Sequence, residues 1–550
     1  MVQETDFPTR HRIDDLVTAW LADADCPGAS VAITDDTDLV HAAGYGHRSL
    51  DPELPATPTT RYGVGSVTKT VTATAVRALV DRGALEVTDP VATYVPYFDA
   101  VPGEPVTVRD LLTHTSGMPS DDLDAHVLAA TVLDTDLGVS LDDWSDFEAF
   151  LAGRSDRRLT DRQRFLYSNS GYVVLARLVE AVSGEPFREF VDRTVLTPAG
   201  MTRTTFDVGA AAGDDDVATP HLRAGADLRP ATYPDHFAFE PIGGLLAPVT
   251  DVAAFLRRHI DGGSAFGAAL ADEAYDAQVV VRTPVGGEPV GYGYGWYVRP
   301  FDGDRLVGHS GNTGVSAGYA GFLRERGLGI AIGCAAPPRR SPETLAVELL
   351  ADLTDTVLAA VSPRTALDET LDSLTGRYAS DGGFHTVTVE RDGPTLVLVH
   401  ETPLGGQELR FRPRTLDGDE YTFGTLEDDG SETVAEFFPS PEGVDLLVDR
   451  VLVERVDGGR RATAAKRHEP PADSATRGPA VAGDRRRDRR FVLGSESSVP
   501  RAPAVPVRAT AGPRPCEPNV LGKYSPRPGP RHEYGRAHAA ERPPENGHRG

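Results

Sequence analysis

Residues 63–70 read GVGSVTKT, and this stretch contains the only lysine of the first 465 residues, Lys69. Ser66 stands three residues before it, and residues three apart share one face of a helix. Apolar side chains follow at three- and four-residue steps as far as Gly83, which predicts a helix that begins near Ser66. The sequence therefore places a lysine amine beside a serine hydroxyl at the start of a helix.

A serine–lysine pair of this kind suits nucleophilic catalysis. A serine hydroxyl is a weak nucleophile until a neighbouring base takes its proton. The positive end of a helix dipole also stabilises the anions that form during acyl transfer. The other interpretation is a chance Ser-x-x-Lys pattern on a surface helix, with about 0.2 occurrences expected in this chain. Because the chain otherwise avoids lysine, we favour the catalytic interpretation for Ser66 and Lys69.

A second stretch, FLYSNSGY at residues 165–172, places Tyr167 and Asn169 just before a predicted helix. A phenol can carry a proton if nearby cations lower its pKa, and an amide can orient a substrate carbonyl. The alternative is that Ser168, Asn169 or Ser170 only caps the helix. Taken alone, this stretch favours the cap.

The third stretch is LVGHSGNTGVSAGYAGF at residues 306–322, which contains His309, Gly311 and Asn312. Glycine in a strand lets a substrate or another backbone segment approach closely. A glycine-rich hairpin explains the isolated pattern equally well.

Together the three stretches carry a resemblance to a known family. Ser66-x-x-Lys69, Tyr167-Ser-Asn169 and His309-Ser-Gly311, in this order, resemble the three active-site motifs of the serine β-lactamase and penicillin-binding protein superfamily. They are most similar to the class C β-lactamase branch with its D,D-peptidase and esterase relatives. Further similar stretches are PGASVAI (27–33), VTVRDLLTHTSGMP (106–119), GGLLAPVTDVAAFL (243–256) and YGYGWYV (292–298).

The resemblance implies an α/β (α+β) β-lactamase-like fold, in which helices and a helical subdomain flank an antiparallel sheet. It implies that Ser66 forms an acyl-enzyme with an ester or amide substrate, and that Lys69 and Tyr167 are the proton-transfer pair. Asn169 would hold a polar group of the substrate. The backbone N–H groups of Ser66 and Asn312 would form the oxyanion hole. No cofactor or metal is implied.

One position departs from the family pattern. Many members have lysine where this chain has His309, so a permanent cation for a substrate carboxylate becomes a group expected to titrate near neutrality. With His309 and Gly311 as substrate-binding residues, this departure favours ester or D-amino-acid peptide hydrolysis over β-lactam hydrolysis. The alternative function is that of a non-catalytic ligand-binding or regulatory protein on the same fold.

Other candidate groups receive structural interpretations. His114 is expected to brace its loop, because the resemblance gives it no catalytic role. The acidic run Asp214–Asp216 is expected to be a solvated loop and not a metal site. Tyr292, Tyr294 and Trp296 fit an acyl pocket and sheet packing equally well. No glycine pattern of the phosphate-binding type lies between a strand and a helix, so nucleotide binding has no support.

The composition is strongly acidic, with 55 Lys+Arg against 82 Asp+Glu and a net charge of −27. Residues 458–550 hold 19 basic and 9 acidic residues, which leaves 36 basic and 73 acidic residues, a net of −37, in 1–457. This acidic, lysine-poor body resembles halophilic proteins, because salt screens its self-repulsion. We expect the body to bind neither nucleic acid nor anionic membranes.

Three regions follow from the pattern of the chain. Residues 1–360 mix strand and helix signals and form the predicted hydrolase domain. Residues 366–457 are short β-patterned runs, which predict a small barrel or sandwich. They resemble the lipocalin-like domain appended to some of these hydrolases, where it would cap the active site or mediate association. Residues 458–550 form an Arg/Pro-rich basic tail predicted to be disordered, either out-of-frame translation or a natural nucleic-acid-binding tail.

The chain shows no targeting or cross-linking signal. The N-terminus lacks the apolar core of a signal peptide, and no stretch reaches 18 consecutive apolar residues, so we expect a cytoplasmic protein without a membrane span. Cys26, Cys334 and Cys516 are scattered, which predicts neither a zinc site nor a disulfide framework. The expected partner is a small-molecule ester, amide or peptide substrate, and the oligomeric state is left open.

Overall fold

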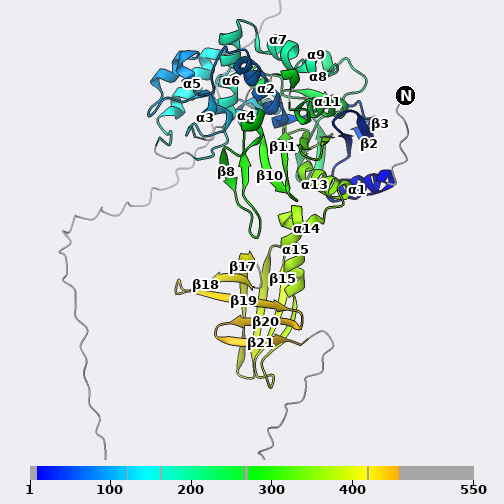
Figure 1. The fold of residues 1–550 in the computed structure, drawn as a ribbon, viewed down its shortest axis with the longest axis vertical. Coiled ribbons are helices and arrows are strands. Elements are labelled where there is room, and N and C mark those ends of the chain that lie inside the picture. The colour runs from blue at the N-terminus through cyan, green and yellow to red at the C-terminus, as the bar shows by residue number, and fades with distance from the viewer. Residues whose placement is uncertain are drawn as a thin grey trace, which may run out of the picture. The chain divides into compact units, whose positions relative to one another are not determined.

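The computed structural model describes residues 9–119, 122–160, 164–262, 264–266, 271–417 and 420–456. Its main sheet has nine antiparallel strands in the order β3-β2-β1-β13-β12-β11-β10-β9-β8 (Figure 1). The strands are β1 (Gly28–Thr34), β2 (Leu39–Leu50), β3 (Glu53–Pro55), β8 (Val279–Arg282), β9 (Val290–Tyr292), β10 (Tyr297–Phe301), β11 (Asp304–Asn312), β12 (Ala317–Leu323) and β13 (Leu328–Cys334).

Helices α1 (Thr9–Asp23) and α13 (Pro342–Leu353) cover one face of this sheet and contact each other. Trp20 of α1 and Leu345 of α13 share an apolar core with Val31 and Ile33 of β1. Ala32, which lies between those two strand residues, belongs to the core on the opposite face. This alternation follows from the two-residue period of a strand.

On the opposite face, α11 (Val249–Ile260) packs on the strands, and α2 (Thr68–Asp81) and α6 (Asn169–Ser183) contribute to the same apolar core. Helix α11 contacts β1, β12 and β13, and α2 contacts α6. The largest apolar core of the described residues fills this side and joins the sheet to the helical subdomain. Gly184, in the left-handed conformation, ends α6.

Shorter elements complete this part of the chain. The remaining helices are α3 (Val108–Leu112), α4 (Leu123–Thr131), α5 (Trp144–Ser155), α7 (Phe187–Val191), α8 (Thr197–Ala199), α9 (Val208–Ala211), α10 (Glu240–Gly243), α12 (Ala271–Tyr275) and α14 (Leu358–Val361). Single turns of tighter or wider helix are η1 (Gly65–Val67), η2 (Val91–Thr93), η3 (Pro96–Ala100), η4 (Asp192–Leu196) and η5 (Ser264–Phe266). Two small sheets pair β4 (Arg61–Gly63) with β7 (Leu246–Pro248) and β5 (His221–Ala224) with β6 (Asp227–Pro230).

The C-terminal part of the described chain begins with α15 (Pro363–Leu374) and continues as a closed barrel of eight strands in sequential order. An up-and-down arrangement of this kind leaves no free sheet edge. The strands are β14 (Gly376–Ala379), β15 (Thr386–Asp392), β16 (Thr395–Thr402), β17 (Gly405–Asp417), β18 (Glu420–Leu426), β19 (Glu432–Ser440), β20 (Gly443–Val448) and β21 (Val451–Arg455).

The fold class predicted from the sequence is confirmed, and so is the small β-barrel. Two stretches of alternating residues are each divided by a turn. Residues 291–298 do not form one strand, because a turn at Gly293–Trp296 separates β9 from β10. Residues 444–456 form two strands, because Asp449 and Arg450 adopt positive φ angles in a tight turn. The basic tail at 458–550 lies outside the described residues. Among the helices of the described chain, none is long and apolar enough to cross a membrane.

Candidate active site

Ser66 and Lys69 meet where the turn η1 leads into helix α2. The ammonium Nζ of Lys69 donates hydrogen bonds to Ser66 Oγ at 3.0 Å and to the backbone carbonyl of Ile242 at 2.9 Å. The Lys69 side chain is fully buried, whereas Ser66 is half-buried. The arrangement leaves the hydroxyl within reach of a small molecule and hides the amine behind it.

Tyr167 completes a cluster of three reactive groups. Its side chain shares a hydrogen bond with Ser66, and the Lys69 ammonium lies 5.0 Å from the centre of its ring. Burial raises the pKa of the Tyr167 phenol well above its usual range, although the hydrogen bond to Ser66 opposes this shift. The condition that nearby cations lower this pKa is therefore not met, and Tyr167 is a protonated phenol in the resting site.

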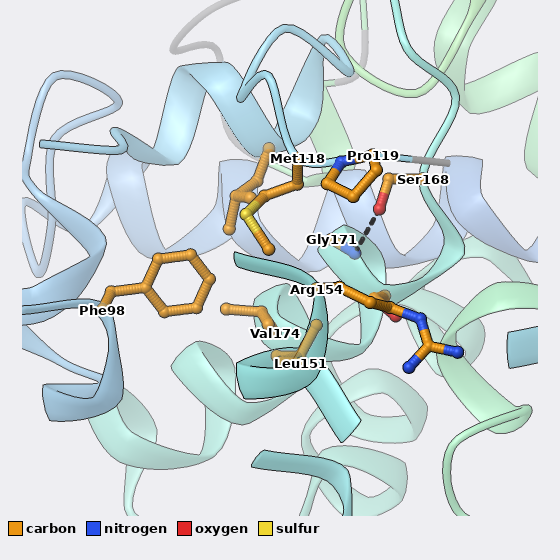
Figure 2. Close-up of a pocket in the computed structure, with 10 residues that line it drawn as sticks. Phe98, Met118, Pro119, Leu151, Arg154, Ser168, Gly171 and Val174 are labelled. Carbon is orange, nitrogen blue, oxygen red and sulfur yellow. Dashed lines mark hydrogen bonds between the residues drawn. The ribbon is translucent and has the colours of Figure 1, made fainter. Parts of the chain in front are cut away.

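Ser168 is the residue that caps the N-terminus of helix α6. Its Oγ accepts a hydrogen bond from the backbone N–H of Gly171 at 3.1 Å (Figure 2). In Figure 2 the cap lies beside a small pocket whose wall includes Met118, Leu151 and Val174. Asn169 is the first residue of α6 and is half-buried. The cap interpretation therefore holds for Ser168, and the substrate-orienting role of Asn169 stays a prediction.

His114 braces the loop that carries Tyr167. Its Nδ1 accepts a hydrogen bond from the Ser168 backbone N–H at 3.1 Å, and its carbonyl accepts one from the Leu166 N–H at 2.8 Å. Its ring lies 4.4 Å from that of Tyr167. Burial, together with the charge of Lys69, lowers the pKa of His114 well below its usual range. These contacts agree with the structural role expected for this histidine.

His309 lies on β11 and is only 2% exposed. Its Nδ1 contacts the Ser310 carbonyl at 2.6 Å, and its Nε2 contacts the Tyr292 hydroxyl at 3.2 Å. Because a carbonyl can only accept, the proton of the neutral ring is on Nδ1, and Nε2 accepts from Tyr292. Burial and the charge of Lys69 lower the pKa of His309 to about 3. The expectation that it titrates near neutrality is wrong, because the ring is buried and lies near the Lys69 cation.

Strand β11 approaches the nucleophile turn so closely that only glycine fits. A Cβ atom on Gly311 would lie 1.8 Å from the Val64 carbonyl oxygen and 2.8 Å from the Ser66 backbone nitrogen. A Cβ atom on Gly65, which has a φ of +55°, would lie 2.4 Å from the Asn312 nitrogen. The backbone nitrogens of Ser66 and Asn312 are therefore held on adjoining segments, and their joint role as an oxyanion hole stays a prediction.

The aromatic residues of 292–298 mainly pack the core. Tyr292, Tyr294 and Trp296 are all buried. The Tyr294 hydroxyl donates to Glu273 at 2.6 Å, and Trp296 stacks on a phenylalanine of α11. Of these three, Tyr292 is the one that supports the site, through its contact with His309. This favours packing over an acyl pocket.

The acidic run at 214–216 is an ion-pair network instead of a solvated loop. Asp216 accepts hydrogen bonds from the hydroxyls of Thr57, Thr59 and Thr60 at 2.6–2.8 Å. Asp214 forms salt bridges with two arginines, at 3.1 and 2.7 Å. The expected solvated loop is wrong for these two side chains, because hydroxyl and guanidinium donors surround them.

Two of the three cysteines lie among the described residues. Cys26 and Cys334 are buried free thiols, and Cys516 lies outside the described residues. Within the described part of the chain, no group of three or more His, Cys, Asp or Glu side chains is placed to hold a metal ion.

Two contributors to the site were not found from the sequence. The Ile242 carbonyl that binds Lys69 belongs to α10, far along the chain, and carbonyls carry no sequence signal. Tyr297 of β10 is half-buried, and its ring lies 5.1 Å from that of His309. The sequence signal that could have identified Tyr297 is its position in the YGYGWYV stretch.

Both parts of the chain are similar to known protein families. A family model described as Beta-lactamase matches residues 13–353, and one described as Pab87 octamerisation domain matches residues 359–453. Penicillin-binding protein 4 of Amycolatopsis lactamdurans is 30% identical over 65% of this chain and 94% of its own length. The putative penicillin-binding protein PbpX of Bacillus subtilis (strain 168) is 28% identical over 51% of this chain and 63% of its own length.

Solved structures show the same fold. The octameric penicillin-binding protein homologue from Pyrococcus abyssi is 31% identical, with a TM-score of 0.66 over 81% of this chain and 99% of its own. The class C beta lactamase from Rhodobacter sphaeroides has a TM-score of 0.52 over 62% of this chain and 99% of its own, at 17% identity, which shows the fold alone. Because the first family model spans more than half of the chain, and Penicillin-binding protein 4 is covered over nearly its whole length, this protein belongs to the beta-lactamase and penicillin-binding protein family.

Proposed function

We propose that this protein is a serine hydrolase that cleaves ester or amide bonds through an acyl-enzyme on Ser66. The observation that carries the proposal is the contact of Ser66 Oγ with Lys69 Nζ at 3.0 Å, with Tyr167 bound to the same hydroxyl. A serine between an amine and a phenol has both a base for activation and a route for the proton.

Acylation requires Lys69 in its neutral form, so the resting ammonium first gives up a proton to solvent. Neutral Lys69 then takes the Ser66 proton as the oxygen attacks the substrate carbonyl, and the backbone N–H groups of Ser66 and Asn312 stabilise the resulting oxyanion. The high pKa of Tyr167 keeps this phenol protonated, which suits it to pass a proton to the departing alcohol or amine. The water molecule that then attacks the acyl-serine gives a proton to the Tyr167 phenolate, and the Lys69 ammonium returns a proton to Ser66 Oγ as the acid product leaves. Asn169 orients the substrate's polar group.

Substrate class follows from the neutral His309. A substrate carboxylate next to this position finds no charged side chain there, because the pKa of His309 is about 3. The position therefore favours neutral esters or D-amino-acid peptides over β-lactams that carry a carboxylate.

The test is hydrolysis of p-nitrophenyl butyrate. Ser66→Ala abolishes hydrolysis, and Lys69→Arg lowers kcat/KM by roughly 10²–10⁴-fold, because a guanidinium stays protonated and cannot act as a base. Ser183→Ala, at the end of α6, is the matched control and keeps full activity. Full activity in Ser66→Ala overturns the proposal.

We also propose that the chain assembles into an oligomer. The support is the match of residues 359–453 to an octamerisation domain and the 31% identity to an octameric homologue. Light scattering coupled to size-exclusion chromatography gives the mass. A purely monomeric protein at micromolar concentration contradicts this proposal.

A further inference from the structure

The C-terminal barrel contains a cavity of about 260 Å³. Eight-stranded barrels are wide enough to be filled by side chains or to hold one small ligand. The cavity is lined by side chains from strands β15, β16, β17, β19 and β20 and from turns at one end of the barrel: Val387, Leu398, His400, Gln407, Leu409, Phe411, Glu427, Thr433, Val448 and Asp449.

The side chains along the barrel interior change character toward this end. Strands β16 and β17 are paired in register, and every second residue of a strand faces the same side. From the deep end outward, the paired residues are Leu396 with Phe411, Leu398 with Leu409, and His400 with Gln407. The first two layers are apolar and the third is polar. An apolar floor therefore lies beneath a polar rim.

The opposite end of the barrel is closed by helix α15. Leu371 and Leu374 of this helix belong to the barrel core, and the Tyr378 hydroxyl donates to the Leu374 carbonyl at 2.9 Å. Arg391, near the far end of β15, forms salt bridges with Asp368 and Asp372 of the same helix. The cavity lies at the other end of β15, near Val387. It is therefore a cup with a single mouth.

The rim is acidic. Glu427 follows β18 and is half-buried, and its Oε1 accepts a hydrogen bond from Thr433 at 2.7 Å. Asp449 lies in the β20–β21 turn, close enough to His400 to act on its charge. Burial, with the neighbouring His385, lowers the pKa of His400 below its usual range, so this ring is neutral at pH 7. The residues that line the cavity include two carboxylates and neither lysine nor arginine.

We propose that this cup binds a small amphipathic amine, with its apolar end on the floor and its ammonium between Glu427 and Asp449. Ligand pockets typically combine an apolar lining with a few polar groups that fix orientation. An ammonium at the rim gains attraction from both carboxylates, and a carboxylate ligand there is repelled. The proposal does not depend on Ser66 chemistry.

Binding to the full-length chain is measured by calorimetry in the lowest salt that keeps the protein folded. The probes are hexylamine, hexanol and hexanoate, which share one apolar tail. We expect hexylamine to bind about tenfold more tightly than hexanol, and its affinity to fall as salt rises, because the charges are near the surface. Hexanoate is expected not to bind. Equal binding of hexylamine and hexanoate, or no binding of hexylamine, overturns the proposal without any variant.

Variants then locate the site. Glu427→Gln combined with Asp449→Asn removes the preference for hexylamine over hexanol, whereas Asp445→Asn, on the outer face of β20, retains it. Leu409→Trp fills the cup and abolishes binding of both. Ser66→Ala retains all binding, so loss of hexylamine binding in Ser66→Ala places the amine in the hydrolase site and overturns the proposal. Release of monomers by hexylamine also overturns it, because the cup would then hold a side chain of a second copy.

Discussion

Lys69 shows how one residue type is retained for its chemistry. The chain has three lysines among 55 basic residues, and arginine fills most other basic positions. Arginine binds carboxylates well but remains protonated, so it cannot take a proton from serine. In the structure Lys69 is buried and its Nζ contacts Ser66 Oγ directly. A buried lysine at this position is explained by its use as a base beside the nucleophile.

Because folded His309 resists protonation, acid pH should lower the stability of the folded protein. In the unfolded chain a histidine takes up its proton near pH 6.5, whereas folded His309 does so only near its pKa of about 3. Between these values the unfolded state binds more protons, so this contribution to stability is complete above pH 6.5 and is lost as the pH falls. From about pH 7.5 to about pH 5.5 the loss is about 1.4 kcal/mol.

Urea unfolding of the wild type and of His309→Gln at both pH values checks this. From the higher to the lower pH, the free energy of unfolding should fall further in the wild type than in His309→Gln, which has no imidazole at this position. The expected difference between the two falls is about 1.4 kcal/mol. Equal pH dependence of the two proteins would show that His309 titrates normally in the fold.

The sequence predicts contacts between residues that lie close together along the chain. Ser66 and Lys69 are one helical turn apart, so spacing alone predicts their contact. The Ile242 carbonyl and the packing of His114 against Tyr167 depend on tertiary contacts across many residues, which no local pattern contains. The pKa of His309 was missed for the same reason, because burial is a property of the fold.

At the scale of elements, the site is the junction of the η1 turn with strand β11. Gly65 and Gly311 let the two backbones approach so closely that a Cβ atom at either position would clash with the other segment. The strand thereby fixes the Asn312 nitrogen beside the nucleophile turn. This is why a glycine follows the histidine and serine of the third motif.

Gly311→Ala is therefore expected to inactivate the protein without unfolding it. The new Cβ would collide with the Val64 carbonyl and force β11 away from Ser66. A displacement of this kind lowers kcat/KM by about 10²-fold or more. Gly153→Ala is the matched control, because a Cβ on this glycine of α5 meets no atom within 4 Å. Esterase assays together with circular dichroism test the pair, and an active Gly311→Ala protein would refute the close approach.

The elements themselves were largely predictable. The strands around the turn at 35–38, the helix after Ser66 and most barrel strands follow from alternation, apolar periodicity and turn residues. The splitting of 291–298 into β9 and β10 was not predicted, because its alternating aromatic and glycine residues continue through the turn. Helix α15 was also missed, since the β-patterned region was expected to begin at 366.

At the scale of the whole molecule, charge dominates. The net charge is −27, and many of the described arginines pair with carboxylates, as Arg203 does with Asp214 at 2.7 Å. Pairing neutralises the arginines but leaves a large acidic excess. The repulsion among these carboxylates opposes the compact state unless salt screens it.

Stability should therefore rise with salt. Between about 0.1 M and about 2 M KCl we expect the Tm to increase by at least roughly 5 °C, because the screening length falls below the spacing of surface charges. Thermal unfolding followed by circular dichroism measures this. Sucrose at equal osmolarity is the control for general exclusion effects, and an equal rise in sucrose, or no rise in KCl, would contradict the electrostatic explanation.

Covalent labelling of Ser66 tests most directly whether this serine is a catalytic nucleophile. The full-length protein is treated with a fluorophosphonate probe and digested, and its peptides are weighed by mass spectrometry. We predict a mass shift on the peptide that contains Ser66, and none in Lys69→Arg under the same conditions. An unlabelled Ser66 peptide in a folded wild-type protein that still binds substrate analogues would contradict it and would indicate a non-catalytic binding protein on this fold.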